Sequence, residues 1–143
     1  MIEYKQAETA NLAEIETLLK YYDLPASDCF LHLENFVVAF AEGKLVGVGG
    51  FESCGNYGLV RSFAVSPEFK GNGIAESIFK IVYDLALEQG KESLYLLTTT
   101  AADYFKKLGF SECVRSNCPE PIKHTKQFLE LCPSSAITML LEL

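Results

Sequence analysis

A short stretch with two glycines, Lys70-Gly71-Asn72-Gly73-Ile74-Ala75, has the residue types of an anion-binding loop. Glycine allows left-handed backbone angles and lets a ligand approach the backbone closely. From Ile74 onward apolar residues recur at helical spacing, so the loop is expected to end at a helix N-terminus. Unpaired amide hydrogens and the helix dipole attract an anion there. The stretch predicts a site for a phosphate-bearing ligand, although a plain strand-to-helix turn would contain the same glycines.

The residues before this loop predict a buried strand. Phe63-Ala64-Val65 is apolar without alternation, as in strands that are covered on both faces. Pro67 ends the strand because proline has no amide hydrogen for the sheet. Two familiar nucleotide motifs do not fit. The loop lacks the Gly-Lys-Ser/Thr of a P-loop, and Glu76 stands where a dinucleotide fold has its third glycine.

The loop residues 70–75, preceded by Val65-Ser66-Pro67, resemble motif A of the GNAT acyltransferases, Gln/Arg-x-x-Gly-x-Gly/Ala. Lys70 replaces the usual Gln or Arg and keeps a positive charge without a planar fork. The resemblance implies that the loop amides hold the pyrophosphate of acetyl-coenzyme A (acetyl-CoA), which serves as the co-substrate.

A second block, residues 98–110, is similar to a GNAT pattern that follows the fifth strand. Thr98 replaces an Asn that contacts the pantetheine arm in that family, and Phe105 replaces the Tyr that protonates the leaving thiolate. Tyr104 is adjacent, but one residue turns a side chain by about 100° on a helix. Tyr104 is therefore either a core aromatic residue or an alternative general acid, and water or residues 98–100 are other sources of the proton. The resemblance assigns these residues to the acetyl-CoA site: Phe63, Ala64, Val65, Lys70, Gly71, Asn72, Gly73, Ile74, Ala75, Thr98 and Phe105.

The last third of the chain resembles one GNAT subfamily, the arsenic-resistance N-acetyltransferases. With two earlier segments, the likeness covers most of the chain, but it does not establish a substrate. It rests on Arg115-Ser116, Pro119, Ile122, Thr125, Phe128, residues 131–136 and Met139, together with residues 59–62 and 97–105.

The apolar spacing predicts alternating strands and helices along one domain, residues 1–143. A helix joins the strands at 59–65 and 93–98, so these two strands are expected to be parallel. The resemblance implies the GNAT fold, which is of the mixed α/β (α+β) class. It has a mostly antiparallel sheet with splayed central parallel strands and helices on both faces. The expected strands are 2–6, 36–41, 45–51, 59–65, 93–98 and 136–143, and the expected helices are 12–22, 27–34, 72–89, 101–108 and 119–131.

Acetyl transfer requires an amide donor for the tetrahedral oxygen and a base for the amine proton. The resemblance places the donor at the splayed end of the central strand, near Val65. Glu34, Glu52 and His124 are candidates for the base, directly or through water. Each is equally consistent with a solvated surface group.

Arg61 is a cation on an otherwise apolar strand. Strand alternation places it on the same face as Phe63 and Val65. A buried cation without a partner is costly. Arg61 is therefore either half of a structural ion pair or an anchor for an anionic acceptor such as an amino-acid carboxylate, with Arg115 as a second cation.

The chain has five cysteines and no CxxC pair, which indicates free thiols in a cytosolic protein. Cys118 and Cys132 lie in the expected wall of the acceptor pocket. Soft thiolates suit trivalent arsenic, but a free cysteine is commonly a small buried hydrophobe. Cys132 is also a candidate nucleophile, although no histidine partner is evident. We expect no metal site.

Composition agrees with a small enzyme. The chain has 143 residues, of which 49% are hydrophobic, and this is enough for one domain with a core. Its net charge of -7 disfavours nucleic-acid binding. No apolar run reaches membrane-spanning length, and residues 1–5 do not resemble a signal peptide.

We therefore expect a cytoplasmic N-acetyltransferase that moves the acetyl group of acetyl-CoA to a small amine, with an acidic amine as one candidate acceptor. A homodimer is a candidate assembly. Two alternatives remain open: a catalytically silent acyl-CoA-binding sensor, suggested by the missing tyrosine, and a protein N-acetyltransferase.

Overall fold

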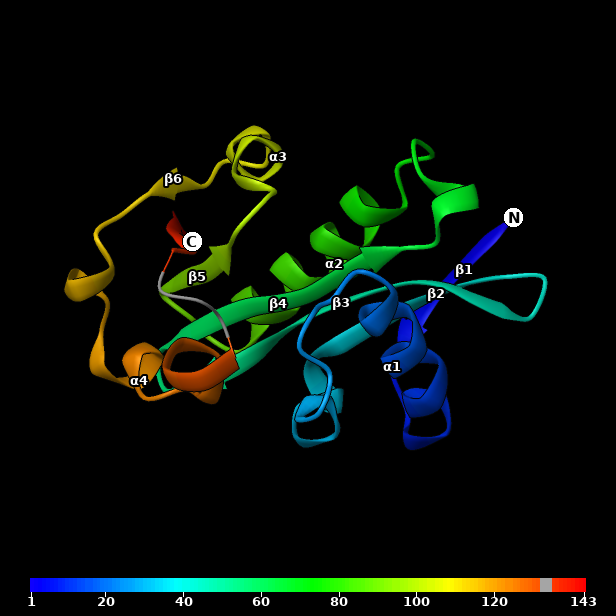
Figure 1. Cartoon of the computed structure of the whole chain (residues 1–143), viewed down its shortest axis with the longest axis horizontal. Coiled ribbons are helices and arrows are strands. Elements are labelled where there is room, and N and C mark those ends of the chain that lie inside the picture. Colours follow the sequence, from blue (N-terminus) through cyan, green and yellow to red (C-terminus); the bar gives the residue numbers. More distant parts are fainter. Residues whose placement is uncertain (132–134) are drawn as a thin grey trace.

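The computed structural model describes residues 1–131 and 135–143 (Figure 1). Within these ranges, no helix combines the length and the apolar character needed to cross a bilayer. The strands are β1 (Ile2–Gln6), β2 (Phe36–Ala41), β3 (Lys44–Cys54), β4 (Tyr57–Val65), β5 (Ser93–Thr98), β6 (Ser111–Glu112) and β7 (Ile137–Glu142). The α-helices are α1 (Leu12–Tyr21), α2 (Ile74–Glu88), α3 (Ala102–Lys107) and α4 (Glu120–Lys123). The 3₁₀ helices are η1 (Thr9–Asn11), η2 (Cys29–Leu31), η3 (Leu33–Asn35), η4 (Pro67–Phe69) and η5 (Arg115–Asn117), and η6 (Gln127–Leu131) is a π-helix.

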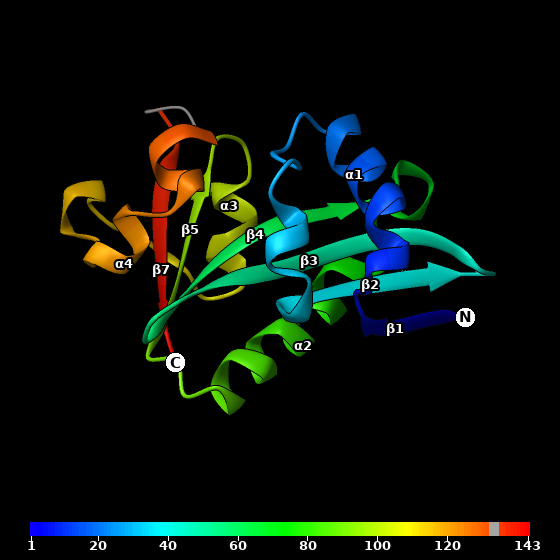
Figure 2. The same cartoon turned by 90° about the horizontal axis from the view of Figure 1, so that it is seen from below.

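The strands form one sheet in the order β1-β2-β3-β4-β5-β7-β6. Among these neighbours, β4 and β5 are parallel and the other pairs are antiparallel. β4 and β5 pair only where residues 57–59 lie beside residues 93–95, and beyond that point the two strands diverge (Figure 2). The predicted mixed sheet with splayed parallel strands is confirmed. β6, at the edge of the sheet, was not predicted.

Helices cover both faces of the sheet, as predicted, with α1 and α2 on opposite sides (Figure 2). The amphipathic α2 buries Ile78 and Val82 in one cluster with the strands. On the other face, α1 buries Ile15 and Leu19 in a second cluster. Burial of each such side chain contributes about 1.5–3 kcal/mol. The two clusters therefore stabilise the sheet from both faces, and the site is built on this sheet.

A β-bulge changes the direction of side chains in β4. Gly49 on β3 opposes two residues of β4, Ser62 and Phe63, and Ser62 has a left-handed φ of 63°. A Cβ atom on Gly49 would lie 2.7 Å from the Phe63 ring, so only glycine leaves room for it. The extra residue turns Arg61 toward η2, whereas Phe63 and Val65 pack on the α2 face. The predicted alternation, with Arg61 on the face of Phe63 and Val65, is therefore wrong.

Two predicted helices take other forms. Residues 27–34 contain two short 3₁₀ turns, η2 and the start of η3, in place of one helix. The helix predicted at 119–131 breaks into α4 and the π-helix η6. Thr125 explains the break, because its hydroxyl donates to the Ile122 carbonyl at 2.8 Å and accepts from the Phe128 N–H at 3.2 Å. Such side-chain bonds compete with the helical main-chain pattern.

Candidate active site

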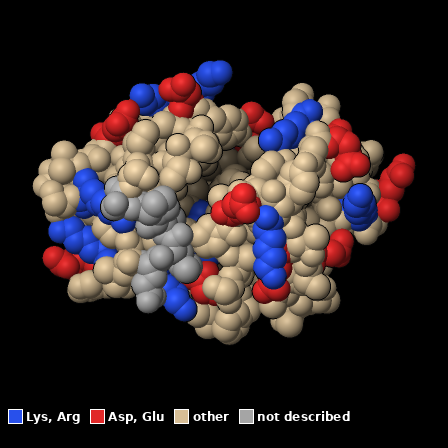
Figure 3. All heavy atoms as spheres, viewed as in Figure 1, with Lys and Arg blue, Asp and Glu red and all other residues tan. Residues whose placement is uncertain are grey.

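A cavity of about 700 Å³ lies where β4 and β5 diverge. The space-filling view shows the surface hollowed near its centre (Figure 3). The walls come from the end of β4, from β5, from the first turn of α2, from α3 and from the loop after α1. Of the eleven residues that the sequence assigns to the acetyl-CoA site, all but Asn72 line this cavity.

The predicted anion-binding loop meets the cavity at the N-terminus of α2. Gly71 and Gly73 have φ angles of 83° and 75°, which side-chain-bearing residues rarely adopt. Gly73 is the N-cap of this 15-residue helix. Its end therefore presents unpaired amide hydrogens and the positive pole of the helix dipole to the cavity. The Lys70 ammonium adds a positive charge to the loop, and its Nζ lies 4.6 Å from the centre of the Tyr22 ring.

Val65 presents its backbone to the open side of β4. It stands opposite Gly47 on β3, and the next residue, Ser66, donates its N–H to the Val46 carbonyl at 2.8 Å. In an antiparallel pair, hydrogen-bonded and non-hydrogen-bonded positions alternate. Val65 is therefore at a non-hydrogen-bonded position, and its N–H and C=O point away from β3, toward the gap that β5 has left. An N–H in this place can donate to a developing oxyanion.

Aromatic rings form the α2 side of the cavity. The Phe63 ring packs edge-on against Phe105, with centroids 6.4 Å apart, and both residues line the cavity. On the β5 side, the Thr98 hydroxyl accepts a hydrogen bond of 2.9 Å from the Ala101 N–H. This bond fixes the turn that leads into α3. The aromatic side of the wall is thus apolar, and it suits a flexible chain that runs between the two strands.

Tyr104 also lines the cavity. Its hydroxyl is buried without a hydrogen-bond partner in the described part of the chain. Burial, with a smaller contribution from the Glu76 carboxylate, raises the pKa of Tyr104 to about 12. The hydroxyl therefore keeps its proton at neutral pH. Its ring packs edge-on against Phe105 with centroids 5.4 Å apart, which is also what a core aromatic residue would do.

Arg61 also lines the cavity, and its side chain is fully buried. Its Nη1 donates to Asp28 Oδ2 at 2.8 Å and to Glu52 Oε1 at 3.2 Å, and Nη2 donates to Asp28 Oδ1 at 2.5 Å. Its Nε donates to Ser62 Oγ at 3.1 Å, and Cys29 Sγ lies 3.9 Å from Nη2. These contacts engage all five N–H groups of the guanidinium.

The two partners of this ion pair are both charged. Burial on its own would raise the pKa of Asp28, but the hydrogen bonds and the charge of Arg61 outweigh it, and the pKa is lowered. Burial would likewise lower the pKa of Arg61, whereas Asp28, Cys29 and Glu52 raise it above its ordinary value. The structure therefore gives Arg61 the partner carboxylates of a structural ion pair.

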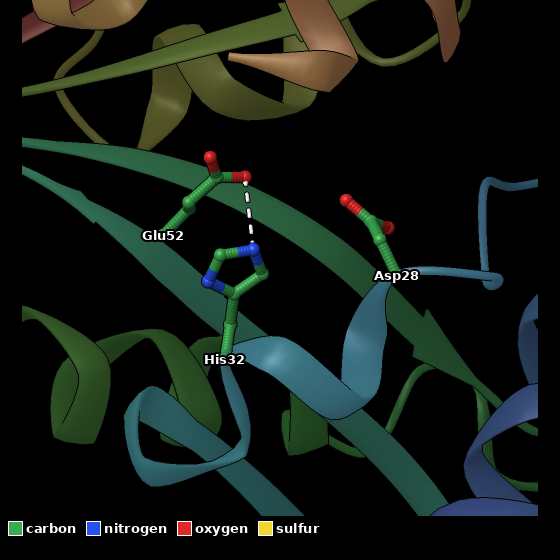
Figure 4. A group of neighbouring side chains, drawn as sticks. All are labelled: Asp28, His32 and Glu52. Atoms are coloured by element: carbon green, nitrogen blue, oxygen red, sulfur yellow. Dashed lines mark ion pairs between the residues drawn. The ribbon is translucent and has the colours of Figure 1, made fainter.

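Asp28, His32 and Glu52 point toward a common space above the sheet (Figure 4). One potential metal-ligand atom of each lies within 4.8 Å of the others. Both Asp28 oxygens and Glu52 Oε1 already accept hydrogen bonds from Arg61, and His32 Nε2 lies 3.4 Å from the same Glu52 Oε1. A metal ion would have to displace a guanidinium and tolerate its charge. The group is therefore better described as an ion-pair network than as a metal centre.

Comparison with known proteins identifies the family. The model described as Acetyltransferase (GNAT) family matches residues 3–110. The chain belongs to this family.

Two curated relatives and one solved structure extend this result. The chain is 29% identical over 108 residues to the citrate (pro-3S)-lyase ligase of Escherichia coli, an alignment that spans 75% of this chain and 29% of the relative. It is 25% identical over 130 residues to the amino-acid acetyltransferase of Neisseria meningitidis. This alignment spans 83% of this chain and 29% of the relative. The chain thus covers less than a third of either protein. The N-acetylglutamate synthase from Neisseria gonorrhoeae, complexed with coenzyme A and N-acetyl-glutamate, superposes with a TM-score of 0.85 at 19% identity. That match covers 100% of this chain and 35% of the other, and it shows the shared fold.

Other predicted site residues of this GNAT chain lie apart from the cavity lining. Glu34 on η3 and His124 after α4 are exposed. The Arg115 guanidinium lies 4.5 Å from the centre of the Phe128 ring and donates to the Phe128 carbonyl at 2.8 Å. Cys132 lies outside the described residues.

Two buried cysteines have the environment of unreactive thiols. Cys118 and Cys54 belong to a small apolar cluster beside α4. Burial raises the pKa of Cys118 to about 11 and the pKa of Cys54 to about 12. The thiolate is the reactive form, so both residues fit the role of small buried hydrophobes at neutral pH.

Sequence reasoning assigned no role in the site to Tyr22, Asp28 or His32. A signal for Asp28 did exist, because a cation on a buried strand requires a carboxylate partner. The partner lies 33 residues earlier in the chain, where local spacing gives no indication of it.

Proposed function

We propose that this chain transfers the acetyl group of acetyl-CoA to the amine of a small acceptor. One observation carries the proposal: an anion-binding helix N-terminus and an outward-facing N–H of Val65 open onto the same cavity. The first suits the pyrophosphate of the co-substrate and the second suits the oxygen of its thioester. Membership of the GNAT family supports this assignment.

The reaction needs few groups from the protein. The amine nitrogen forms a bond to the thioester carbon, the carbon–sulfur bond breaks, and the sulfur leaves with the electron pair as a thiolate. The Val65 N–H stabilises the negative oxygen that forms on the way. The thiolate is a tolerable leaving group. Water or the protonated Tyr104 hydroxyl can supply its proton, and we favour a packing role for Tyr104.

The proton that the amine loses requires a base. Of the three predicted candidates, we favour Glu52. It is not itself one of the lining residues, but it accepts a hydrogen bond from Arg61, which is. Its Oε1 accepts from Arg61, and within the described ranges no hydrogen bond engages its Oε2. Glu52 is 9% exposed, so its side chain is largely shielded from solvent.

The acceptor is proposed to be a small molecule. The curated relative named amino-acid acetyltransferase supports a small amine over a protein amine. An acidic acceptor was expected to bind Arg61, but the five N–H groups of Arg61 are engaged by Asp28, Glu52, Ser62 and Cys29. We therefore propose a small amine and assume no acid group. The cytoplasmic location, the homodimer and the link to arsenic resistance stay predictions from the sequence.

The test is acetyl-CoA turnover with a panel of neutral, acidic and basic small amines. Release of the coenzyme A thiol, together with an acetylated product seen by mass spectrometry, supports the proposal. Calorimetric binding of acetyl-CoA without thiol release above hydrolysis would favour the silent acyl-CoA-binding sensor instead. Acetylation of proteins but of no small amine would favour the protein N-acetyltransferase.

A further inference from the structure

Tyr22 reaches from the end of α1 to the open end of β4. Its hydroxyl donates a hydrogen bond of 2.6 Å to the Val65 carbonyl, and the two residues lie 43 positions apart in the sequence. Both line the cavity. Tyr22 therefore contacts the residue whose N–H faces the expected thioester.

The Tyr22 hydroxyl bonds to the edge of β4 that faces β5, where a longer β5 pairing would otherwise provide the hydrogen bonds. The parallel pairing of β4 with β5 stops at Leu59, six residues before Val65. The C=O and N–H of Val65 point together toward the resulting gap, because Val65 is at a non-hydrogen-bonded position opposite Gly47. A buried carbonyl without a partner is costly. Because β5 has diverged from β4 at this point, the Tyr22 hydroxyl provides the hydrogen-bond donor for the Val65 carbonyl.

Tyr22 itself is held from several directions. Its N–H donates to the Leu19 carbonyl at 3.1 Å, which ties it to the last turn of α1. Its ring meets the Tyr21 ring edge-on at 4.9 Å, and the Lys70 ammonium lies 4.6 Å from its centre on the side of the phosphate loop. These contacts restrict the Tyr22 side chain, and they favour the orientation in which its hydroxyl reaches the Val65 carbonyl.

We propose that Tyr22 is a positioning residue, which fixes the Val65 backbone so that its N–H points at the thioester oxygen. The proposal rests on the proposed function, since it concerns the same acetyl transfer. The C=O and the N–H of Val65 lie on one side of the strand, and anchoring the first limits the rotation of the second. Because catalytic hydrogen bonds depend steeply on alignment, a free strand end would weaken the oxyanion contact without removing it.

The same side chain also links the two ends of the co-substrate site. Its ring supports Lys70 at the phosphate loop, while its hydroxyl holds Val65 at the reacting end. Two substitutions separate these contacts. Tyr22→Phe removes the hydroxyl and keeps the ring, whereas Tyr22→Leu removes both. Tyr21→Phe is the matched control, since Tyr21 is 66% exposed and is the adjacent tyrosine on the same helix.

For Tyr22→Phe we expect kcat to fall about tenfold while the dissociation constant of acetyl-CoA stays within a factor of two. This loss is smaller than the roughly 10²–10³-fold loss typical of deleting an oxyanion donor outright. For Tyr22→Leu we expect the same fall in kcat and also weaker acetyl-CoA binding, because the support of Lys70 is lost. Tyr21→Phe should behave as the parent protein.

Isotope-edited infrared spectroscopy distinguishes the positioning role of the Tyr22 hydroxyl from a purely structural role. In the complex of the parent protein with acetyl-CoA labelled with ¹³C at the carbonyl, the Val65 N–H should shift the thioester band to lower frequency than in water. In Tyr22→Phe the band should move back toward its position in water, and Tyr21→Phe should leave it in place. Spectra and kinetics are recorded below the melting temperature of each variant, so a loss of stability alone does not move the band.

An unchanged band in folded Tyr22→Phe overturns the positioning role, whatever its kcat, and so does an unchanged kcat. Failure of Tyr22→Phe to fold would also count against the proposal, because the hydroxyl would then be required for the fold itself. Failure of the proposed function looks different. In that case the parent protein itself would not bind acetyl-CoA or would not release coenzyme A with any amine.

Discussion

Arg61 and Asp28 form a two-pronged ion pair that joins β4 to η2. The two guanidinium nitrogens Nη1 and Nη2 lie 2.8 Å and 2.5 Å from the two carboxylate oxygens. Neither side chain is appreciably exposed, at 0% and 4%. The loop that precedes η2 also lines the cavity, so this pair holds the wall of the acceptor side against the central strand.

Replacing Arg61 should destabilise the fold. Arg61→Ala leaves the buried Asp28 carboxylate without its partner, and removal of one member of a buried pair costs about 3–5 kcal/mol. Arg61→Lys keeps the charge but loses the planar fork, so we expect a smaller loss. Urea unfolding measures both, with the exposed Lys80→Ala as the control. A large rise in the acceptor's KM with little change in unfolding free energy would instead make Arg61 the anchor of an acidic acceptor.

The pair also predicts how stability depends on pH. The pKa of Asp28 is lowered in the folded protein, against the effect of burial, by hydrogen bonds and charge from Arg61. Its contribution to stability is therefore fully present above the ordinary carboxyl pKa of about 4 and is lost as the pH falls through the lowered value. Asp28→Asn should be less stable than the parent at pH 7, and the difference should shrink in acid. Equal pH profiles for the two proteins would contradict this, and Asp84→Asn, at an exposed site on α2, is the control.

The sequence was a good guide to the parts of the fold that rest on local patterns. The helix α2, the glycine loop before it and the parallel strand after it follow from apolar spacing and from the backbone freedom of Gly71 and Gly73. The bulge at Ser62 could not be read in this way, because a left-handed angle at a serine leaves no signature in the apolar pattern. That single inserted residue reversed the predicted face of Arg61.

The acceptor side of the site depends on contacts between distant segments. Tyr22 meets Val65 across 43 positions, and Asp28 meets Arg61 across 33. Spacing rules act within a few residues and do not reveal such pairs. The break of the helix predicted at 119–131 has the same kind of cause, since it depends on what the Thr125 hydroxyl bonds to in the folded chain.

Tyr104 has two possible roles, packing and proton donation, and only proton donation requires its hydroxyl oxygen. If it is a packing residue, Tyr104→Phe should leave kcat near that of the parent, and Tyr104→Ala should lower stability through the lost aromatic volume, by less than in a fully buried core because Tyr104 is half-buried. A proton donor would instead contribute about 10²–10⁴-fold to the rate. Steady-state kinetics on the Phe variant decide between the two, with Tyr83→Phe on α2 as a control. We expect the packing outcome, and a hundredfold loss of kcat would contradict it.

Gly73 offers the sharpest test of the phosphate site, because the chain contains a matched glycine. Gly73 and Gly90 stand at opposite ends of α2, both have a φ of 75°, and a Cβ on either would meet no protein atom within 4 Å. Valine at either position should therefore cost similar backbone strain. Only at Gly73 would the side chain stand over the amides that we assign to the pyrophosphate, so Gly73→Val should weaken acetyl-CoA binding at least tenfold, about 1.4 kcal/mol, while Gly90→Val should not. Calorimetry on both folded variants measures the difference, and equal affinities for acetyl-CoA would show that this loop does not hold the pyrophosphate.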